Sequence, residues 1–242
     1  MEPALQINNL CVKYGKSTDN AVKDLSFSVK KGSIVGFLGP NGAGKTSTIK
    51  SILGIIAPYK GTISIFGDPL SKRTKELIGY MPEIANYYNY LTPKELLYFY
   101  GKLFNINRTV LRIRIKQLLT NAGLLSKRND LLKTFSKGML QKVSFAQALI
   151  NDPDLLILDE PTTGLDPIAR MQMRDTLIEL KNNGKTILFS SHELSEVELI
   201  CDNIIILKSG QLVTQNSPAN LVNKKGEHVS VEKYFFEMIK AS

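Results

Sequence analysis

The segment Gly39–Thr46, which reads Gly-Pro-Asn-Gly-Ala-Gly-Lys-Thr, constrains the fold of this chain more than any other. It fits the pattern G-x-x-x-x-G-K-[ST], in which the backbone N–H groups of a glycine-rich loop surround phosphate. The apolar run 34–38 before it predicts a buried strand, and residues 47–53 after it predict a helix. Strand, loop and helix is the context that this pattern needs, because a helix N-terminus carries partial positive charge. The alternative, a glycine-rich turn that binds nothing, is disfavoured by that context.

The loop therefore predicts a bound nucleotide with Mg²⁺. Lys45 is expected to reach the β- and γ-phosphates, and the Thr46 hydroxyl is expected to hold the metal ion. The residues expected to contact the nucleotide are Gly39, Pro40, Asn41, Gly42, Ala43, Gly44, Lys45, Thr46 and Ser47.

A second motif lies in the other half of the chain. The apolar run 155–158 ends in Asp159 and Glu160, and a continuous apolar run suits a central parallel strand that is covered on both faces. Ligands in such sheets bind at the carboxyl ends of the strands, where these two acids fall. Asp159 is placed to hold Mg²⁺, and Glu160 to polarise a water that attacks the γ-phosphate. The alternative is an exposed acidic turn after a core strand.

Basic residues are concentrated in one window. The chain has a formal net charge of +9, and the window 102–142 holds ten lysines and arginines against the single acid Asp130, so it carries the whole excess. Such a basic surface suggests a polyanionic binding partner, which could be nucleic acid, anionic lipid headgroups or nucleotide phosphates. A solvated helical face is the equally weighted alternative.

Composition excludes several classes of protein. No apolar run approaches the ~18 residues of a membrane span, and the N-terminus shows no signal pattern, so a cytoplasmic location is expected. Cys11 and Cys201 form neither a disulfide framework nor a metal cluster, and both are expected to be core residues in a reducing compartment.

The pattern of elements predicts an interrupted α/β domain. Residues 5–14, 21–30, 61–67 and 78–82 predict strands, and 155–158, 186–190, 204–207 and 211–213 predict more of them. Helices are expected from a capping box at Thr92–Glu95, over 111–122, over 138–150, from Asp166 to Gly184 and over 193–201. Residues 84–151 thus form a helical insert, and 216–242 a C-terminal helical extension of the core made of 1–83 and 152–215.

In the order of these motifs, the chain resembles the nucleotide-binding subunit of ATP-binding cassette (ABC) transporters over nearly its whole length. Tyr14 matches the aromatic residue that stacks on adenine, and Glu83 holds the position of a glutamine that senses Mg²⁺ and water. Residues 135–139 fall where the LSGGQ signature belongs, with Lys137 in place of its first glycine and Met139 in place of its glutamine. Residues 164–166 match the D-loop, and His192 matches the switch histidine.

The resemblance implies roles for these residues. Ser136 and Gly138 are expected to contact ATP held by a partner subunit, His192 to donate to the γ-phosphate, and Glu83 to join Thr46 and Asp159 at the metal ion. The Ser-Lys-Gly-Met form resembles an exporter-like branch. Clustered tyrosines near Glu83, at positions 87, 88 and 90, are expected to contact a transmembrane permease subunit, whereas Tyr100 is expected in the core.

The sequence therefore predicts an α/β fold with a P-loop NTPase core. We expect a mixed, mainly parallel sheet flanked by helices, an antiparallel β part at the N-terminus and the helical insert. The expected function is an ATPase subunit of a membrane transporter, and the expected direction of transport is export. The subunit is expected to act as a homodimer, or as a heterodimer with a similar subunit, at the inner face of the membrane.

Two other functions are open to such a sequence. One is a soluble ABC ATPase that acts on nucleic acid or the ribosome, which the basic window slightly favours. Such proteins usually carry two cassettes or a long coiled coil, and this chain shows neither, so nucleic acid is not the expected partner. A P-loop kinase for a small molecule is disfavoured by the residues at 135–139, by Asp166 and by His192.

Overall fold

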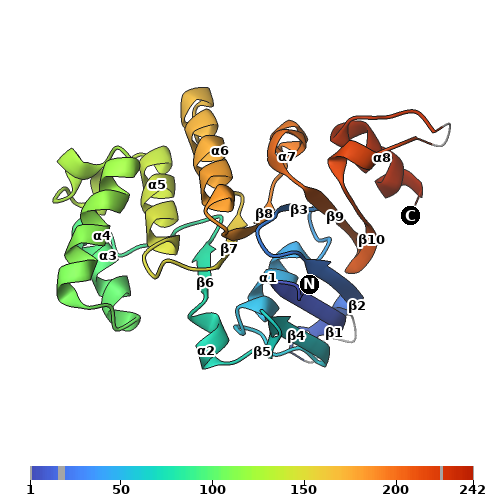
Figure 1. Ribbon diagram of the computed structural model, residues 1–242, viewed down its shortest axis with the longest axis horizontal. Helices are drawn as coiled ribbons and strands as arrows, with labels where there is room; N and C mark the ends of the chain where they lie inside the picture. Colours follow the sequence, from blue (N-terminus) through green and yellow to red (C-terminus); the bar gives the residue numbers. More distant parts are fainter. Residues whose placement is uncertain (1, 16–19, 224–225, 242) are drawn as a thin grey trace.

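The structure is a computed structural model that describes residues 2–15, 20–223 and 226–241. A central sheet is flanked by helices, a second sheet lies beside it, and helices α3 (Pro93–Leu103), α4 (Arg108–Asn121) and α5 (Lys137–Ala148) form one end of the molecule (Figure 1). The predicted fold class is confirmed by this arrangement.

The central sheet has six strands in the order β10-β9-β3-β8-β7-β6. All neighbours are parallel except β9 and β10, so the sheet is mixed and mainly parallel, as predicted. Its strands are β3 (Ile34–Leu38), β6 (Ile78–Met81), β7 (Leu155–Asp159), β8 (Thr186–Ser190), β9 (Asn203–Lys208) and β10 (Gln211–Asn216). Every residue of β3, β7 and β8 is buried, which explains why these strands read as continuous apolar runs.

The second sheet is antiparallel, with the strand order β2-β1-β4-β5. Its strands are β1 (Leu5–Lys13), β2 (Asn20–Val29), β4 (Lys60–Ile65) and β5 (Asp68–Pro69). The sequence did not predict β5, because two residues are too few to show a period. It also extended β4 too far, since Phe66 and Gly67 both have positive φ and turn the chain.

Two apolar clusters cover the two faces of the central sheet. The alternation along β7 divides its side chains between them: Leu156 and Leu158 belong to the cluster under α6, α7 and α8, and Leu155 and Ile157 to the cluster shared with α1 and the second sheet. The remaining helices are α1 (Lys45–Ile52), α2 (Lys72–Lys75), α6 (Pro167–Asn182), α7 (Leu194–Ile200) and α8 (Val231–Ala241), with 3-10 turns η1 (Leu125–Lys127), η2 (Leu132–Thr134) and η3 (Pro218–Asn220).

Side-chain caps fix the beginnings of four helices that the sequence predicted, α3, α4, α5 and α6. Thr92 and Glu95 form the expected capping box at α3, with Pro93 at the first helical position. The Asp166 side chain accepts a hydrogen bond from the Ala169 N–H at α6, at 2.8 Å. These caps satisfy N–H groups that have no partner within the helix. Helix α4 begins three residues earlier than predicted, after the cap at Asn107.

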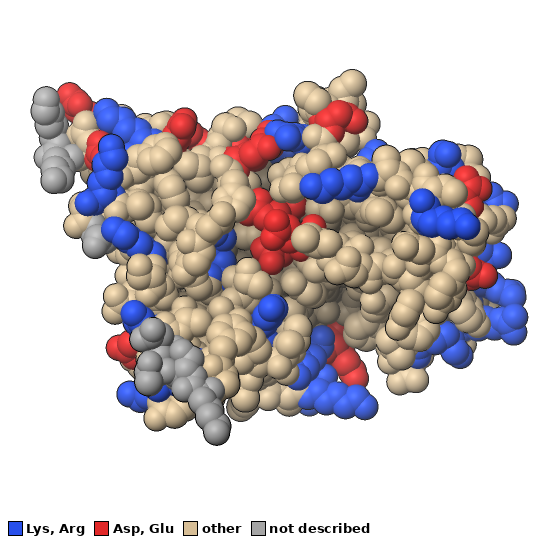
Figure 2. Space-filling model, turned by 180° about the vertical axis from the view of Figure 1, so that it is seen from behind, with Lys and Arg blue, Asp and Glu red and all other residues tan. Residues whose placement is uncertain are grey.

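A third apolar cluster lies within the helical end and joins α3, α4 and α5. Tyr87 differs from the expectation of a free interface ring, because it is half-buried against this cluster and its hydroxyl donates to Gln147 Oε1 at 3.3 Å. Burial raises the pKa of Tyr87. Tyr88 and Tyr90 are 65% and 68% exposed. Lys and Arg side chains gather at this end of the molecule (Figure 2), where the basic window lies.

The two cysteines are free thiols in different surroundings. Cys201 is buried, as predicted, and burial raises the pKa of its thiol well above the ordinary value. Cys11 is only partly buried, so the expectation of a core residue is wrong for it, since β1 lies in a sheet that covers the core with one face only. Among the described residues, no helix is both long enough and apolar enough to cross a membrane.

Candidate functional site

The glycine loop joins the end of β3 to the beginning of α1. Gly44 is the residue that caps α1, with a left-handed φ of 100° and no side chain that could accept from the helix N–H groups. A Cβ at Gly44 would lie 2.8 Å from the Ala21 carbonyl oxygen, so the loop can pack this closely only with glycine here. The first N–H groups of α1 are therefore available to an anion, which is the arrangement typical of phosphate sites.

Lys45 is the first residue of α1 and is almost fully buried. Its ammonium group donates to the Gly39 carbonyl at 2.5 Å and to the Pro40 carbonyl at 3.4 Å, so it lies over the loop. Burial lowers the pKa of Lys45, and the nearby carboxylates of Glu160, Asp159 and Glu83 partly oppose that shift. The group is thus a desolvated cation whose field is strong at short range.

Strands β7 and β8 bring the two acids to the same place. Asp159 pairs with Ser190 in the parallel register. Ser190 Oγ donates to Asp159 Oδ1 at 2.6 Å and accepts from the Glu160 N–H at 3.0 Å. One hydroxyl therefore orients the Asp159 carboxylate and the backbone of Glu160 together. Glu160 has a φ of 53°, a conformation that non-glycine residues rarely adopt.

The Glu160 side chain is 5% exposed and lies beside His192. Its Oε2 accepts from the His192 N–H at 3.2 Å, and its Oε1 lies 3.2 Å from His192 Nε2 without the alignment of a hydrogen bond. Desolvation raises the pKa of Glu160, and the interactions with His192 and Lys45 partly oppose this rise. A carboxylate with a raised pKa is a better proton acceptor near neutral pH than an ordinary one.

These groups surround a single cavity of about 290 Å³. It is lined by Ala21, Pro40, Asn41, Gly42, Ala43, Gly44, Lys45, Thr46, Ser47, Glu83, Asp159, Glu160 and His192. The loop, the strand-end acids, Glu83 and the histidine come from distant parts of the sequence, so only the folded sheet brings them together.

The donor set of this cavity fits Mg²⁺. Thr46 supplies a hydroxyl, and Asp159 and Glu83 supply carboxylates, all of them hard oxygen donors. No cluster of three or more His, Cys, Asp or Glu side chains suited to a metal ion occurs among the described residues. Mg²⁺ needs none, because it usually binds one or two carboxylates and completes its shell with water and substrate phosphates.

Four of the predicted site residues do not line this cavity. Gly39 contacts it through its carbonyl, which accepts a hydrogen bond from the Lys45 ammonium group. Tyr14 is 45% exposed and touches the site through Ser47, with 3.0 Å between its hydroxyl and Ser47 Oγ. Ser136 is exposed and caps α5 by accepting from the Met139 N–H at 3.3 Å. Gly138 lies in the first turn of α5 next to the Gly164 backbone. Within one chain, Ser136 and Gly138 therefore do not reach the phosphate loop.

The sequence did not identify two residues that hold the site in shape. Ser190 is the last residue of a predicted strand, and its bridge between the acids depends on the register of β7 and β8. Gln141, in α5, is buried, and its side-chain amide donates to the Glu160 carbonyl at 3.0 Å. A glutamine on the apolar face of a helix was the available signal, because a buried amide needs a polar partner.

Comparison with known proteins agrees with this geometry. Residues 22–163 match the family model described as ABC transporter. An uncharacterised ABC transporter ATP-binding protein of Synechocystis is 43% identical over 88% of this chain and 64% of its own length. The Nod factor export ATP-binding protein I of Ralstonia nicotianae is 38% identical over 91% of this chain and 69% of its own length. The chain thus spans about two thirds of the lengths of these two relatives.

A solved structure, described as the ATP binding subunit of an ABC transporter, is similar along the whole chain. It is 32% identical, covers 98% of this chain and 99% of its own, and superposes with a TM-score of 0.90. The family match extends over more than half of the chain and includes the glycine loop and both acids. This chain therefore belongs to the ABC transporter family, as one of its ATP-binding, ATP-hydrolysing proteins.

Proposed function

We propose that this protein is the ATPase subunit of a membrane exporter and works on the inner face of the membrane with a separate transmembrane permease. The observation that carries the proposal is the cavity that unites the glycine loop with Asp159, Glu160 and His192. The name of the Ralstonia relative, which refers to export, supports the direction of transport. The names of the relatives favour transport over the alternative of a soluble ATPase acting on nucleic acid or the ribosome.

In the proposed reaction, the loop N–H groups and Lys45 bind the β- and γ-phosphates. Glu160 accepts a proton from the water that attacks the γ-phosphate, and His192 donates a hydrogen bond to that phosphate. Thr46, Asp159 and Glu83 would hold Mg²⁺, which neutralises charge on the phosphate oxygens when bound. Tyr14, beside Ser47, offers its ring to the adenine base.

We further propose that two copies, or one copy and a similar subunit, pack head to tail around two ATP molecules. Ser136 and Gly138 stand at the exposed N-terminus of the 12-residue helix α5, which favours anions. Gln141 of the same helix contacts the Glu160 backbone, so the surface offered to a partner is connected to the catalytic carboxylate of its own chain. Closure of such a dimer would transmit ATP binding to the permease.

The dimer is tested by sizing the Glu160→Gln protein with and without ATP. We expect a monomer without ATP and a dimer with it, because the closed state is not lost through hydrolysis. Adding Ser136→Arg should abolish the ATP-dependent dimer, since a bulky cation would stand where phosphate belongs. Ser126→Arg, an equally large change in the exposed turn η1, is the matched control and should leave the dimer intact. A monomer under all conditions, with the permease included, would contradict the proposal.

A groove beside β6 is the proposed docking site for the permease. It has a volume of about 380 Å³, and its lining includes Tyr80, Tyr87, Tyr100, Leu103 and Phe104. The groove begins next to Glu83, so a segment bound there would lie close to the nucleotide cavity. The exposed pair Tyr88 and Tyr90, with ring centroids 5.5 Å apart, would extend this contact surface.

Leu103→Glu is expected to weaken copurification of the permease by roughly tenfold or more, because it places a charge in an apolar contact. Leu103 is 61% exposed, so the fold should tolerate the change. Ile113→Glu, at a residue of α4 that is 56% exposed and lies outside the groove, is the matched control. Equal copurification of both variants would place the interface elsewhere, and ATP binding should be unchanged in each.

A further inference from the structure

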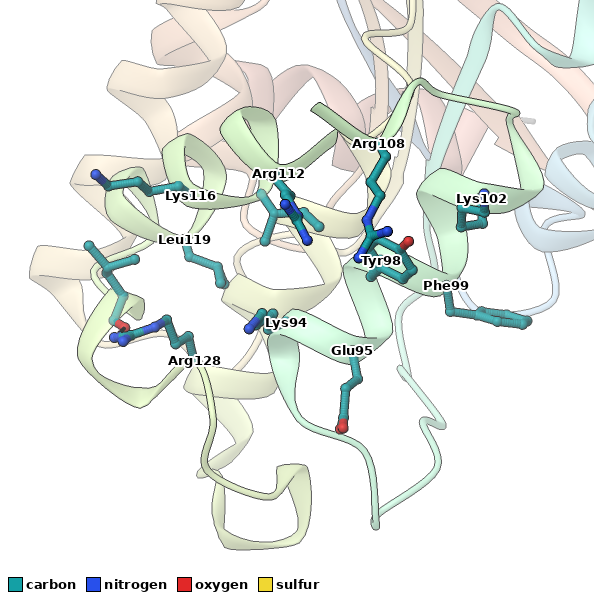
Figure 3. A pocket seen from close by; sticks show the side chains of 12 residues that line it. Lys94, Glu95, Tyr98, Phe99, Lys102, Arg108, Arg112, Lys116, Leu119 and Arg128 are labelled. Atoms are coloured by element: carbon teal, nitrogen blue, oxygen red, sulfur yellow. Dashed lines mark hydrogen bonds between the residues drawn. The ribbon is translucent and has the colours of Figure 1, made fainter. Parts of the chain in front are cut away.

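A larger cavity lies between α3 and α4, away from the nucleotide site. Its volume is about 980 Å³, which is at the upper end of the range for ligand pockets. Lys94, Tyr98 and Lys102 recur every four residues along α3, and Arg108, Arg112 and Lys116 do so along α4, so each helix presents one stripe to the cavity. Figure 3 shows Arg108 and Arg112 extending from α4 toward Tyr98 on α3.

The rim of this cavity carries positive charge that the protein does not neutralise. Six cations line it, and none of them forms an ion pair with any residue in the described ranges. The cations are Lys94, Lys102, Arg108, Arg112, Lys116 and Arg128. The one acid of the lining, Glu95, accepts hydrogen bonds from the Thr92 N–H and hydroxyl, both at 2.9 Å. Like charges around one cavity repel one another, and a bound anion would relieve that repulsion.

The floor of the cavity is apolar. Ile115 and Leu119 of α4 are buried members of the apolar cluster of this helical end, and Leu125 and Tyr98 pack against it. Phe99, at the edge, is 52% exposed and points away from the other labelled side chains (Figure 3). A cationic rim over an apolar floor matches a ligand that has an anionic group beside a hydrocarbon part.

We propose that this cavity binds an anionic phospholipid of the membrane in which the permease lies. The phosphodiester would contact Arg108, Arg112 and Lys94, and the upper part of the acyl chains would cover Tyr98 and Leu119. This inference rests on the proposed function, because helix α3 would carry both contacts: Leu103 and Phe104 line the permease groove, and Lys102 lines the lipid cavity. A permease in the groove would thus bring the cavity close to the bilayer.

Other polyanions match the cavity less well. An acidic peptide would have to supply carboxylates and an apolar face together, whereas one phospholipid carries both parts in each molecule. Nucleic acid is usually bound along an open basic groove with exposed stacking aromatics, whereas Tyr98 is half-buried among aliphatic side chains. The permease and the lipid would then hold the helical end of the protein at two adjoining places.

The test is cosedimentation of the purified protein with vesicles, in the absence of permease and ATP. Wild-type protein should bind vesicles that contain phosphatidylglycerol and not vesicles of phosphatidylcholine alone. Arg108→Gln combined with Arg112→Gln should weaken binding roughly 30-fold, since each basic residue near an anionic surface contributes about fivefold. Lys72→Gln combined with Arg73→Gln removes the same charge from exposed residues of α2 and should change binding by less than about twofold.

The outcomes separate this proposal from its alternatives. Equal losses in the two double variants would mean diffuse attraction by net charge, and the cavity would not be a lipid site. Displacement of the protein from vesicles by millimolar inorganic phosphate would mean a free-phosphate site and would also overturn the proposal. The proposal would also be overturned if the Arg108→Gln, Arg112→Gln double variant bound vesicles normally but lost binding to poly-glutamate or RNA, because the cavity would then take an acidic peptide or nucleic acid. ATP binding, measured on the same proteins, should be unchanged, so a failure here is distinct from a failure of the proposed ATPase function.

Discussion

Glu160→Gln should lower ATP turnover by ~10²–10⁴-fold while ATP binding is retained, as expected for loss of a general base. The substitution keeps the size and shape of a side chain that is 5% exposed, so the fold should survive. It removes the carboxylate whose pKa desolvation raises, and the amide that replaces it cannot take a proton from water. Steady-state phosphate release gives the turnover, and equilibrium titration with ATP gives the affinity.

The matched control for this variant is Glu179→Gln, which makes the same chemical change on the exposed face of α6 and should leave turnover unchanged. The wild-type rate should also fall as the pH is lowered through the raised pKa of Glu160, because the protonated carboxyl cannot accept a proton. Unchanged turnover in the Glu160→Gln protein would show that another group, or water alone, takes the proton.

Lys45→Ala should weaken ATP binding by roughly 10- to 100-fold, the equivalent of one charge-assisted hydrogen bond. Lys45 is almost fully buried at the glycine loop, and burial lowers its pKa, so the protein holds a desolvated ammonium there at some cost. Phosphate oxygens would repay that cost. Without ATP, the variant should be about as stable as the wild type. It loses the hydrogen bonds of the ammonium group to the Gly39 and Pro40 carbonyls, but it also loses the cost of burying that charge.

Lys50→Ala serves as the control, since it removes a lysine from the same helix, outside the lining of the cavity. Calorimetric titration with ATP and Mg²⁺ measures the affinities, and thermal unfolding without ATP checks the fold. Tight ATP binding by a folded Lys45→Ala protein would exclude the lysine from phosphate recognition.

Local patterns predicted most of the secondary structure because these elements depend on local physics. The capping box at Thr92 and Glu95 begins α3 whatever the helix packs against. A continuous apolar run such as 155–158 is buried on both faces only in the middle of a sheet. The errors arose where local signals are weak. The strand β5 is too short to show a period, and α4 begins at Arg108, after a cap at Asn107 that is not distinctive in the sequence.

Burial of single side chains was predicted less well. Tyr87 and Tyr88 are neighbours of the same type, yet Tyr87 packs on the helical cluster and bonds Gln147, whereas Tyr88 is 65% exposed. Cys11 was expected in the core and is only partly buried. Which of two similar residues turns inward depends on the elements that pack against them, and those come from elsewhere in the chain.

The sequence by itself determined the loop 39–46, the acids Asp159 and Glu160 and the α/β class, because spacing and apolar runs encode them directly. Only the tertiary structure decided how these groups meet. The parallel register of β7 and β8 sets Ser190 between the two acids, and the turn after β8 brings His192 to Glu160. Only the packing of α3 on α4 reveals that Lys94 and five cations scattered through the basic window surround one cavity. Long-range pairing has no local signature, since it is fixed by the burial of whole faces rather than by neighbouring residues.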